Sequence, residues 1–213
     1  NKRYLYDGQF VSPSIRTDSF VKTATDEEIL QDKALDYRVL NFATSTFNEN
    51  QTSYWHKSVG GYHAAKLRRY QELIDYHIGD EMQEVYRQVA AAGGEMGEVD
   101  GSDFPVINML NTRYFIFPVG DKGETVPIQN PYAMGNAWFV STVNYVANAN
   151  EEIAALDSFN PTRTAVVNSN FQAALHDITG VPTDSAAYVK LDTYEPNHLR
   201  YTTSNSQDGV AVF

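Results

Sequence analysis

The run "TRYFIFPV" at residues 112–119 is the feature that most constrains the fold of this chain. It is mostly apolar and rich in aromatic and β-branched side chains, which is typical of a strand buried on both faces. Such a strand needs partners on its edges and other elements packed against its faces. The run therefore predicts a strand at the centre of a sheet.

Helical and strand patterns alternate on either side of this run. Residues 63–78 and 80–92 carry apolar side chains at three- and four-residue steps, which predicts two amphipathic helices. Gly79 is well placed to end the first of them. Residues 43–61 are rich in Ser, Thr, Asn and Gly and predict a long loop. Further short helices are expected at 25–33, 102–110, 148–156 and 169–175, and further strands at 36–42, 136–146 and 163–167.

Four of these helices begin at residues with typical N-cap chemistry, among them the helix at 102–110, which begins with Ser102. Thr25 and Glu28 have the spacing of a capping box, and so do Ser169 and Gln172. Asn148 is placed to accept a hydrogen bond from the backbone of the first turn that follows it. The caps support the predicted positions of the helix starts.

The order of these elements predicts an α+β fold. We expect an extended arm over residues 1–24, a mixed sheet with packed helices over 25–180, and antiparallel β structure over 181–213. The β-α-β order over 136–167 indicates some parallel pairing. The chain begins without Met and stops on an apolar strand pattern, so we expect a piece of a longer protein with a truncated β segment.

Composition excludes several classes of function. The net charge is −11, whereas a protein that binds nucleic acid needs a basic face, so nucleic acid is not an expected partner. The absence of Cys excludes disulfides, zinc–thiolate sites and a Cys nucleophile. No apolar window of about 18 residues is present to span a membrane.

The segment "TSYWHKSVGGYHAAKLRRYQELIDYH", residues 52–77, is the best candidate for a ligand site. A double glycine at the start of the predicted helix would leave backbone N–H groups free, and the helix dipole would favour an anion there. Basic side chains add charge, and aromatic rings could stack on a sugar. The expected ligand-binding residues are Trp55, His56, Lys57, Gly60, Gly61, Tyr62, His63, Lys66 and Arg69.

The same segment also fits a purely structural interpretation. Arg68 and Glu72 are four residues apart and can pair on a helix surface, and the glycines can simply turn the chain. His56 and His63 lack the spacing that points two helical ligands at one metal ion, so no metal site is predicted. No nucleophile elbow, Walker loop or dinucleotide motif is present, so the residues predict neither a catalytic group nor a cofactor.

Five runs of sequence, taken in this order and spacing, resemble one known family. The runs are "YRVLNFATSTFNENQTSYWHKSVGGYHAAKLRRYQELID" (37–75), "MLNTRYFI" (109–116), "NAWFV" (136–140), "EEIAALDSFNPTRTAVV" (151–167) and "YEPNHLRY" (194–201). On these runs the chain is similar to the extracytoplasmic domain of YfhO-like bacterial membrane proteins, over about residues 20–213.

This resemblance implies a polytopic protein related to GT-C glycosyltransferases, which move a sugar from a polyprenyl-phosphate donor to an acceptor outside the cytoplasmic membrane. In that pattern the catalytic acid lies in an early loop between transmembrane helices. This sequence has no counterpart of that loop, so no catalytic residue is carried over. The full-length protein would be a glycosyltransferase of cell-surface polymers, and this piece alone would not be catalytic.

The resemblance also sets the expected location and partners. The domain would lie on the extracytoplasmic, periplasmic side of the bacterial cytoplasmic membrane, against its own transmembrane domain. It would bind or orient a cell-surface glycan acceptor or a polyprenyl-phosphate sugar. Two alternatives stay open from the sequence: a stand-alone carbohydrate-binding module, and a structural or assembly domain of a membrane complex.

Overall fold

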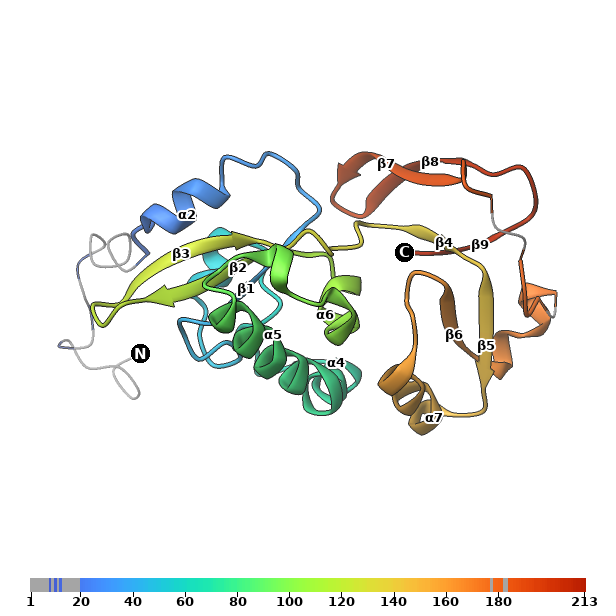
Figure 1. Cartoon of the computed structure of the whole chain (residues 1–213), viewed down its shortest axis with the longest axis horizontal. Coiled ribbons are helices and arrows are strands. Elements are labelled where there is room, and N and C mark those ends of the chain that lie inside the picture. The colour runs from blue at the N-terminus through green and yellow to red at the C-terminus, as the bar shows by residue number, and fades with distance from the viewer. Residues whose placement is uncertain (1–7, 9, 11, 13–19, 177, 182–183) are drawn as a thin grey trace.

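The computed structural model describes residues 20–176, 178–181 and 184–213, together with residues 8, 10 and 12. The predicted arm over residues 1–24 therefore falls largely outside the described residues. The described chain has two parts, which lie beside one another along the longest axis (Figure 1). We call residues 20–135 the N-terminal region and residues 136–213 the C-terminal region.

A three-stranded sheet organises the N-terminal region. Strand β2 lies between β1 and β3, parallel to the first and antiparallel to the second. The prediction that the run "TRYFIFPV" forms a central strand is confirmed. The strands are β1 (Arg38–Asn41), β2 (Thr112–Val119) and β3 (Glu124–Gln129).

Strand β3 is not predicted from the sequence, because Pro127 interrupts an otherwise alternating pattern. Proline lacks a backbone N–H, whereas in a central strand the N–H of every residue donates to one of the two neighbouring strands. The structure resolves the conflict by placing β3 at the edge of the sheet, where Pro127 lies opposite Ile116 of β2.

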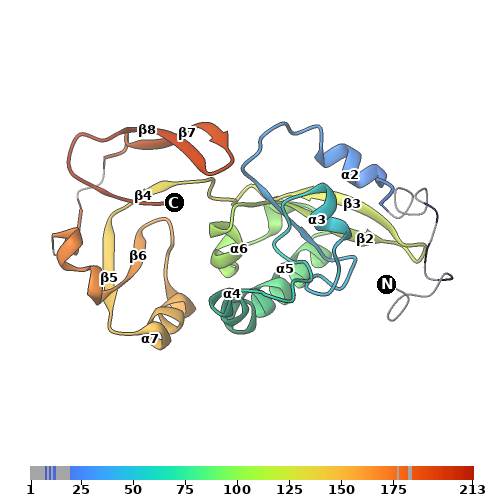
Figure 2. The same cartoon turned by 180° about the vertical axis from the view of Figure 1, so that it is seen from behind.

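One continuous helical segment runs from Arg68 to Ala91 on one side of this sheet (Figures 1 and 2). It consists of α4 (Arg68–Leu73), a π-helical turn (Ile74–Ile78) and α5 (Gly79–Ala91). The prediction that Gly79 ends a helix is wrong. Its backbone is helical, with φ −60° and ψ −47°, and its N–H donates to the carbonyl of Ile74 five residues earlier. The extra residue in this turn lets the helix continue.

The start of this helix also differs from the prediction. The helix was expected from residue 63, but α4 begins at Arg68, and residues 61–67 are neither helix nor strand. Conversely, the loop predicted over residues 43–61 contains a short helix, α3 (Gln51–Trp55). A helix of five residues is too short to show the apolar period from which helices are predicted.

The N-terminal caps are partly as predicted. Helix α7 (Ala149–Ala154) is capped by Asn148, which confirms that expectation. The capping box of α2 (Ala24–Ile29) is formed by Thr23 and Asp26 instead of the predicted pair, since the Thr25 hydroxyl lies 2.7 Å from both the carbonyl and the hydroxyl oxygen of Thr125. The predicted helix at 169–175 is two single 3-10 turns.

Helix α6 (Pro105–Met109) is capped from a different helix. The prediction that Ser102 caps this helix is wrong, because the helix begins three residues later and its N-cap position is Phe104, which has no capping side chain. The carboxylate of Glu81 on α5 takes the place of a cap. Its two oxygens accept hydrogen bonds from the N–H groups of Val106 (2.9 Å) and Ile107 (2.8 Å). Burial outweighs these two bonds and raises the pKa of Glu81 to about 7.

The hydrophobic core lies between the sheet and these helices. Phe115 of β2 and Phe104 are both fully buried and meet edge to face at 6.4 Å between ring centroids. Val85 and Val89 of α5 are buried against the same cluster. A second, smaller cluster forms where Ile29 of α2 packs with Val39 of β1 and Ile116 of β2. The N-terminal region is therefore a well-packed α+β unit.

Among its described residues, the C-terminal region contains three two-stranded sheets. The pairs are antiparallel for β4 with β9 and for β7 with β8, and parallel for β5 with β6. The expected parallel pairing and the expected hairpin are confirmed, whereas the strand predicted over 136–146 is two strands separated by Ser141. The strands are β4 (Trp138–Val140), β5 (Thr142–Val146), β6 (Thr164–Asn168), β7 (Tyr188–Glu195), β8 (His198–Ser204) and β9 (Val210–Val212).

The two regions contact one another at several places. Leu156, just after α7, packs against the N-terminal core, and His77 on the π-helical turn has its Nε2 2.8 Å from the carbonyl oxygen of Ile153. On the other side, the Lys57 ammonium lies 3.8 Å from the ring centroid of Tyr194 at the tip of the β7–β8 hairpin. The predicted class, α+β with a mixed sheet followed by antiparallel strands, is confirmed.

Candidate functional site

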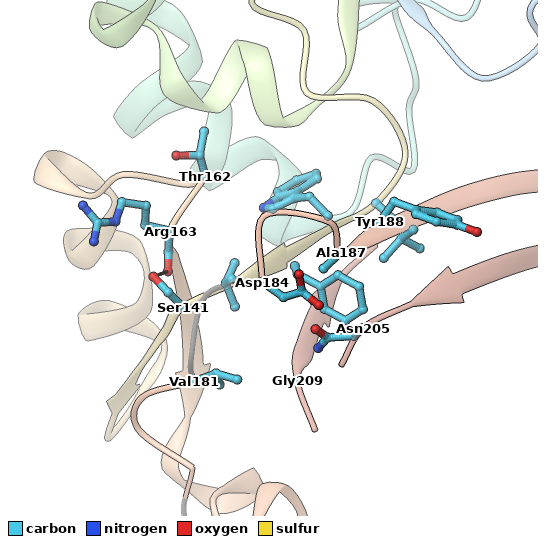
Figure 3. A pocket seen from close by; sticks show the side chains of 14 residues that line it. Ser141, Thr162, Arg163, Val181, Asp184, Ala187, Tyr188, Asn205 and Gly209 are labelled. Carbon is cyan, nitrogen blue, oxygen red and sulfur yellow. Dashed lines mark hydrogen bonds between the residues drawn. The ribbon is translucent and has the colours of Figure 1, made fainter. Parts of the chain in front are cut away.

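A cavity of about 560 Å³ lies in the C-terminal region between β4, β9 and the hairpin (Figure 3). This volume is within the range of small-molecule sites. Its lining comes from segments distant in sequence. The lining residues are Ala137, Trp138, Phe139, Val140, Ser141, Thr162, Arg163, Val181, Asp184, Ala187, Tyr188, Val189, Asn205 and Gly209.

Strand β4 supplies the aromatic wall of this cavity. Trp138 and Phe139 are both half-buried on β4, which pairs with β9. The indole N–H of Trp138 donates to the carbonyl of Pro161 at 2.8 Å. Because its polar atom is satisfied in this way, the ring is held in one orientation and offers its apolar surface to the cavity.

Asp184 ties together the two loops that border the cavity. Its Oδ1 accepts from the N–H of Ala186 and its Oδ2 from the N–H of Ser206, both at 2.9 Å. The hydrogen bonds from Ser206 and Ala186 hold the pKa of Asp184 below its ordinary value. The carboxylate is therefore ionised at neutral pH and serves to position the start of β7 beside the loop after β8.

Gly209 is required for the packing at the bottom of the cavity. A Cβ at this position would lie 2.5 Å from Nδ2 of Asn205 and 3.2 Å from Cδ1 of Phe139. The absence of a side chain lets Asn205 and Phe139 approach the backbone together. Any larger residue would displace at least one of these two lining groups.

The cavity combines aromatic faces with hydrogen-bonding groups. Asp184 and Asn205 lie near its centre, and Arg163 and Tyr188 lie on opposite sides (Figure 3). Within the described part of the chain, no acidic side chain pairs with Arg163. Guanidinium, amide and hydroxyl groups around apolar rings suit a ligand with many hydroxyls and an apolar C–H face.

The residues predicted to form an anion site lie elsewhere, and none of the nine lines this cavity. His56 is buried, with its Nε2 2.9 Å from Oδ1 of Asp26. Arg69 lines a separate cleft of about 220 Å³ between α4 and α7. Tyr62 and His63 are exposed on the loop before α4. The structure therefore does not gather the predicted set around one cavity.

Lys57 and Lys66, which lie between α3 and α4, each place their ammonium group over an aromatic ring. The Lys57 ammonium lies over Tyr194, as described above, and the Lys66 ammonium lies 5.4 Å from the ring centroid of Phe47. Trp55 also makes a cation–π contact, with the Lys22 ammonium 4.5 Å from its ring centroid. Its buried indole N–H has no hydrogen-bond partner among the described residues.

Gly60 and Gly61 allow the loop to pack closely against Thr46, and no helix begins at either of them. A Cβ on Gly60 would lie 2.0 Å from the carbonyl oxygen of Thr46, and Gly61 has φ +101°. The N–H of Gly61 donates to that same Thr46 oxygen at 2.7 Å. The prediction that these two glycines stand at a helix N-terminus, where an anion would be attracted, is therefore wrong, since α4 begins at Arg68. The ligand set itself stays a prediction.

Sequence reasoning missed the residues that line the cavity. Trp138 and Phe139 belong to the run "NAWFV", and Arg163 to the run "EEIAALDSFNPTRTAVV", both of which carry the family resemblance. Their presence in two such runs was a usable signal. Nothing in the sequence indicated that these runs meet in space.

Searches of protein-family models, of curated proteins and of solved structures found no match to this chain. Across residues 20–176, 178–181 and 184–213, no helix is both long and apolar enough to cross a bilayer. The same residues contain no group of three or more His, Asp or Glu side chains placed to hold a metal ion.

Proposed function

We propose that this chain is the extracytoplasmic domain of a YfhO-like, multi-spanning bacterial membrane protein, and that it binds a saccharide without transferring it. The full-length protein would be a GT-C-like glycosyltransferase of cell-surface polymers. The saccharide would be the glycan acceptor or the sugar part of a polyprenyl-phosphate donor. The domain would hold it in place for a catalytic centre in the transmembrane part.

The observation that carries this proposal is the cavity of Figure 3. Two runs that carry the family resemblance, 136–140 and 151–167, meet at its wall. Aromatic faces pack against the C–H groups of a sugar ring, whose partial positive charge complements the negative face of the aromatic system. Asn205, Arg163 and Ser141 supply donors and acceptors for hydroxyl groups.

The described lining of the cavity does not hold the pair of carboxylates that glycoside hydrolysis typically uses. Glycoside hydrolysis typically uses two carboxylates on opposite sides of the scissile bond. Asp184 is the one carboxylate among the described lining residues, and both of its oxygens accept backbone N–H groups. These contacts support a binding role, because a general acid must be protonated and free to reach the substrate.

The binding proposal is tested by calorimetric titration of the 213-residue chain with a panel of neutral and acidic oligosaccharides from bacterial surface polymers. We expect saturable binding, weakened about tenfold by Trp138→Ala or Tyr188→Ala, because each removes one ring face. Tyr194→Ala is the matched control, since Tyr194 lies on the same hairpin but does not line the cavity. Equal losses in all three variants, or no binding to any member of the panel, would contradict the proposal.

The membrane part of the proposal has a separate test in the complete reading frame. A YfhO-like protein requires apolar segments of about 20 residues in the same polypeptide as this domain. A stand-alone carbohydrate-binding module would share the cavity but lack those segments. The reading frame therefore distinguishes these two functions without any binding experiment.

An assembly role has one specific observation in its favour. Most side chains of the β7–β8 hairpin are exposed, including Tyr188 at 49% and Leu199 at 50%. Under that alternative, Leu199→Asp would abolish association with a partner protein and leave saccharide affinity unchanged. Co-purification of the full-length variant with its membrane partners distinguishes the two roles.

A further inference from the structure

The charge of the chain is unevenly distributed. Residues 50–71 contain no Asp or Glu and four basic residues, so this stretch carries +4. Since the whole chain carries −11, the remainder carries −15. The basic residues are Lys57, Lys66, Arg68 and Arg69. We call residues 57–69 the basic loop; Figure 2 shows the chain between α3 and α4 running along α5.

Two large apolar side chains project from the basic loop into solvent. Leu67 is 77% exposed, the highest value for a large hydrophobic side chain among the described residues, and Tyr62 is 66% exposed. Exposed single hydrophobic residues are common on protein surfaces. Here, however, two of them lie within five positions of each other and are flanked by the basic side chains.

The backbone of the basic loop is held by hydrogen bonds, so the exposure of these side chains is built into the fold. The N–H of Tyr62 donates to the carbonyl of Glu49 at 2.8 Å. At the other end, the carbonyl of Leu67 accepts from the N–H groups of Tyr70 and Gln71, both at 3.0 Å. Gly60 packs directly against Thr46, as described above. Leu67 and Tyr62 are thus fixed at the surface.

Apolar tips surrounded by cations fit an anionic bilayer surface better than a soluble polyanion. A polyanion needs positive charge alone, whereas a bilayer also accepts Leu and Tyr side chains at the boundary between headgroups and acyl chains. Lys and Arg near such a surface are attracted to anionic headgroups while their stems pack on apolar groups. The acidic remainder of the chain would be repelled, which leaves the basic loop as the contacting surface.

We propose that the basic loop docks this domain on an anionic lipid surface. Leu67 and Tyr62 insert at the headgroup boundary, and Lys66 and Arg69 lie against the lipid phosphates. Arg68 contributes less, because its Nε is 2.8 Å from a carboxylate oxygen of Glu72. The inference rests on the proposed function only in placing the chain beside a membrane; the saccharide cavity takes no part in it.

The test is flotation of the 213-residue chain with vesicles of phosphatidylcholine alone or with about one third phosphatidylglycerol. We expect binding to the anionic vesicles alone. Leu67→Ser should weaken it about tenfold, since the apolar contact is lost. Lys66→Gln combined with Arg69→Gln should weaken it about thirtyfold, since two headgroup attractions are lost. Leu199→Ser, on the exposed hairpin, is the matched control and should bind as the wild type does.

Absence of binding to anionic vesicles by the wild type overturns the inference. So does a Leu67→Ser variant that binds like the wild type while soluble polyphosphate competes fully, because that result identifies a polyanion site instead. Circular dichroism of each variant establishes that it is folded. Saccharide titration without vesicles is unaffected by either outcome, so failure of lipid docking and failure of the proposed function are distinguishable.

Discussion

The N-terminal and C-terminal regions are stabilised in different ways. Among the described residues, sixteen of the twenty buried hydrophobic side chains lie in the N-terminal region and four in the C-terminal region. The first region surrounds a three-stranded sheet with helices, whereas the second consists of three sheets of two strands each. Two-stranded sheets are at best marginally stable alone. The C-terminal region therefore depends on its loops and on its neighbour.

The cavity of Figure 3 lies in the region that has fewer buried hydrophobic side chains. A close-packed core leaves few voids larger than a water molecule. Where short sheets meet through loops, faces such as those of Trp138 and Tyr188 stay uncovered and the loops border a space of about 560 Å³. In many proteins a rigid unit supports a less tightly packed unit that holds the binding residues. The predictions below test whether the two regions differ in this way, beginning with the largest expected effect.

Phe115→Ala should remove the centre of the N-terminal core. Phe115 is fully buried and contacts the rings of Phe42 and Phe104, so we expect a loss of about 3–5 kcal/mol in the free energy of unfolding. Phe171→Ala in the C-terminal region is the control, since Phe171 is 61% exposed, and its effect should stay within about 0.5 kcal/mol. Urea denaturation measures both; comparable losses would remove the contrast between the regions.

Glu81 should make the stability of the N-terminal region depend on pH. Burial raises its pKa from 4.5 to about 7 despite the hydrogen bonds from Ile107 and Val106, so the folded state binds a proton that the unfolded state has released. This contribution is complete below about pH 4.5 and is lost as pH rises through about 7. The wild type should therefore lose up to about 3 kcal/mol over this range.

Glu81→Gln should flatten this part of the pH profile, because the amide does not titrate. Glu84→Gln on the same helix is the control: side-chain hydrogen bonds from Arg87 and Gln88 lower the pKa of Glu84 to about 2, so it is ionised throughout the range. Denaturation midpoints between pH 4.5 and 8 measure the effect. A slope of equal size in the Glu81→Gln variant would show that another group is responsible.

Leu156→Ala should weaken the contact between the two regions. Leu156 is partly buried against the N-terminal core, so we expect a loss of about 1–2 kcal/mol. Hydrogen exchange should report faster opening of β5 and β6 with little change in β1 and β2. An equal increase in the hydrogen-exchange rates of both regions would indicate that the molecule opens as one unit.

Asn148→Ala should have the smallest effect, about 1 kcal/mol, because it removes one N-cap from α7. Asn148→Asp is the control and should retain most of the stability, since its carboxylate can accept the same backbone N–H groups. Thermal unfolding compares them. If the Asn148→Asp variant were as unstable as the alanine variant, the hydrogen bonds of the N-cap would not be the source of the lost stability.

The elements predicted correctly from the sequence are those with long periodic or continuous apolar patterns. The strand at 112–119 and the helix at 80–92 are of this kind, and their own side chains determine where they lie. Gly79 was misassigned because a π-helical turn adds one residue and carries the helix through it. Such a turn depends on packing, here of the buried His77 and Ile78, and leaves no local signature.

The cavity could not have been predicted from the sequence, because no local pattern indicates that its segments meet. The pairing of β4 with β9, across about 70 positions of the chain, brings Gly209 close to Trp138, whereas Arg163 is held there because its carbonyl accepts from the N–H groups of Ser141 and Thr142. A ligand site is predicted in segment 52–77 because its basic and aromatic residues are close together in sequence. The structure uses several of them for packing, as in the buried His56–Asp26 pair.

The chain contains two Trp residues, one in each candidate site, and this allows a direct test of the central claim that the C-terminal cavity binds the saccharide. In the Trp55→Phe variant, fluorescence reports Trp138 in the cavity. In the Trp138→Phe variant, it reports Trp55 in the predicted segment. Titration with the tightest-binding oligosaccharide should give a saturable change in the first variant and none in the second. A saturable change confined to the Trp138→Phe variant would contradict the account and assign the ligand to segment 52–77.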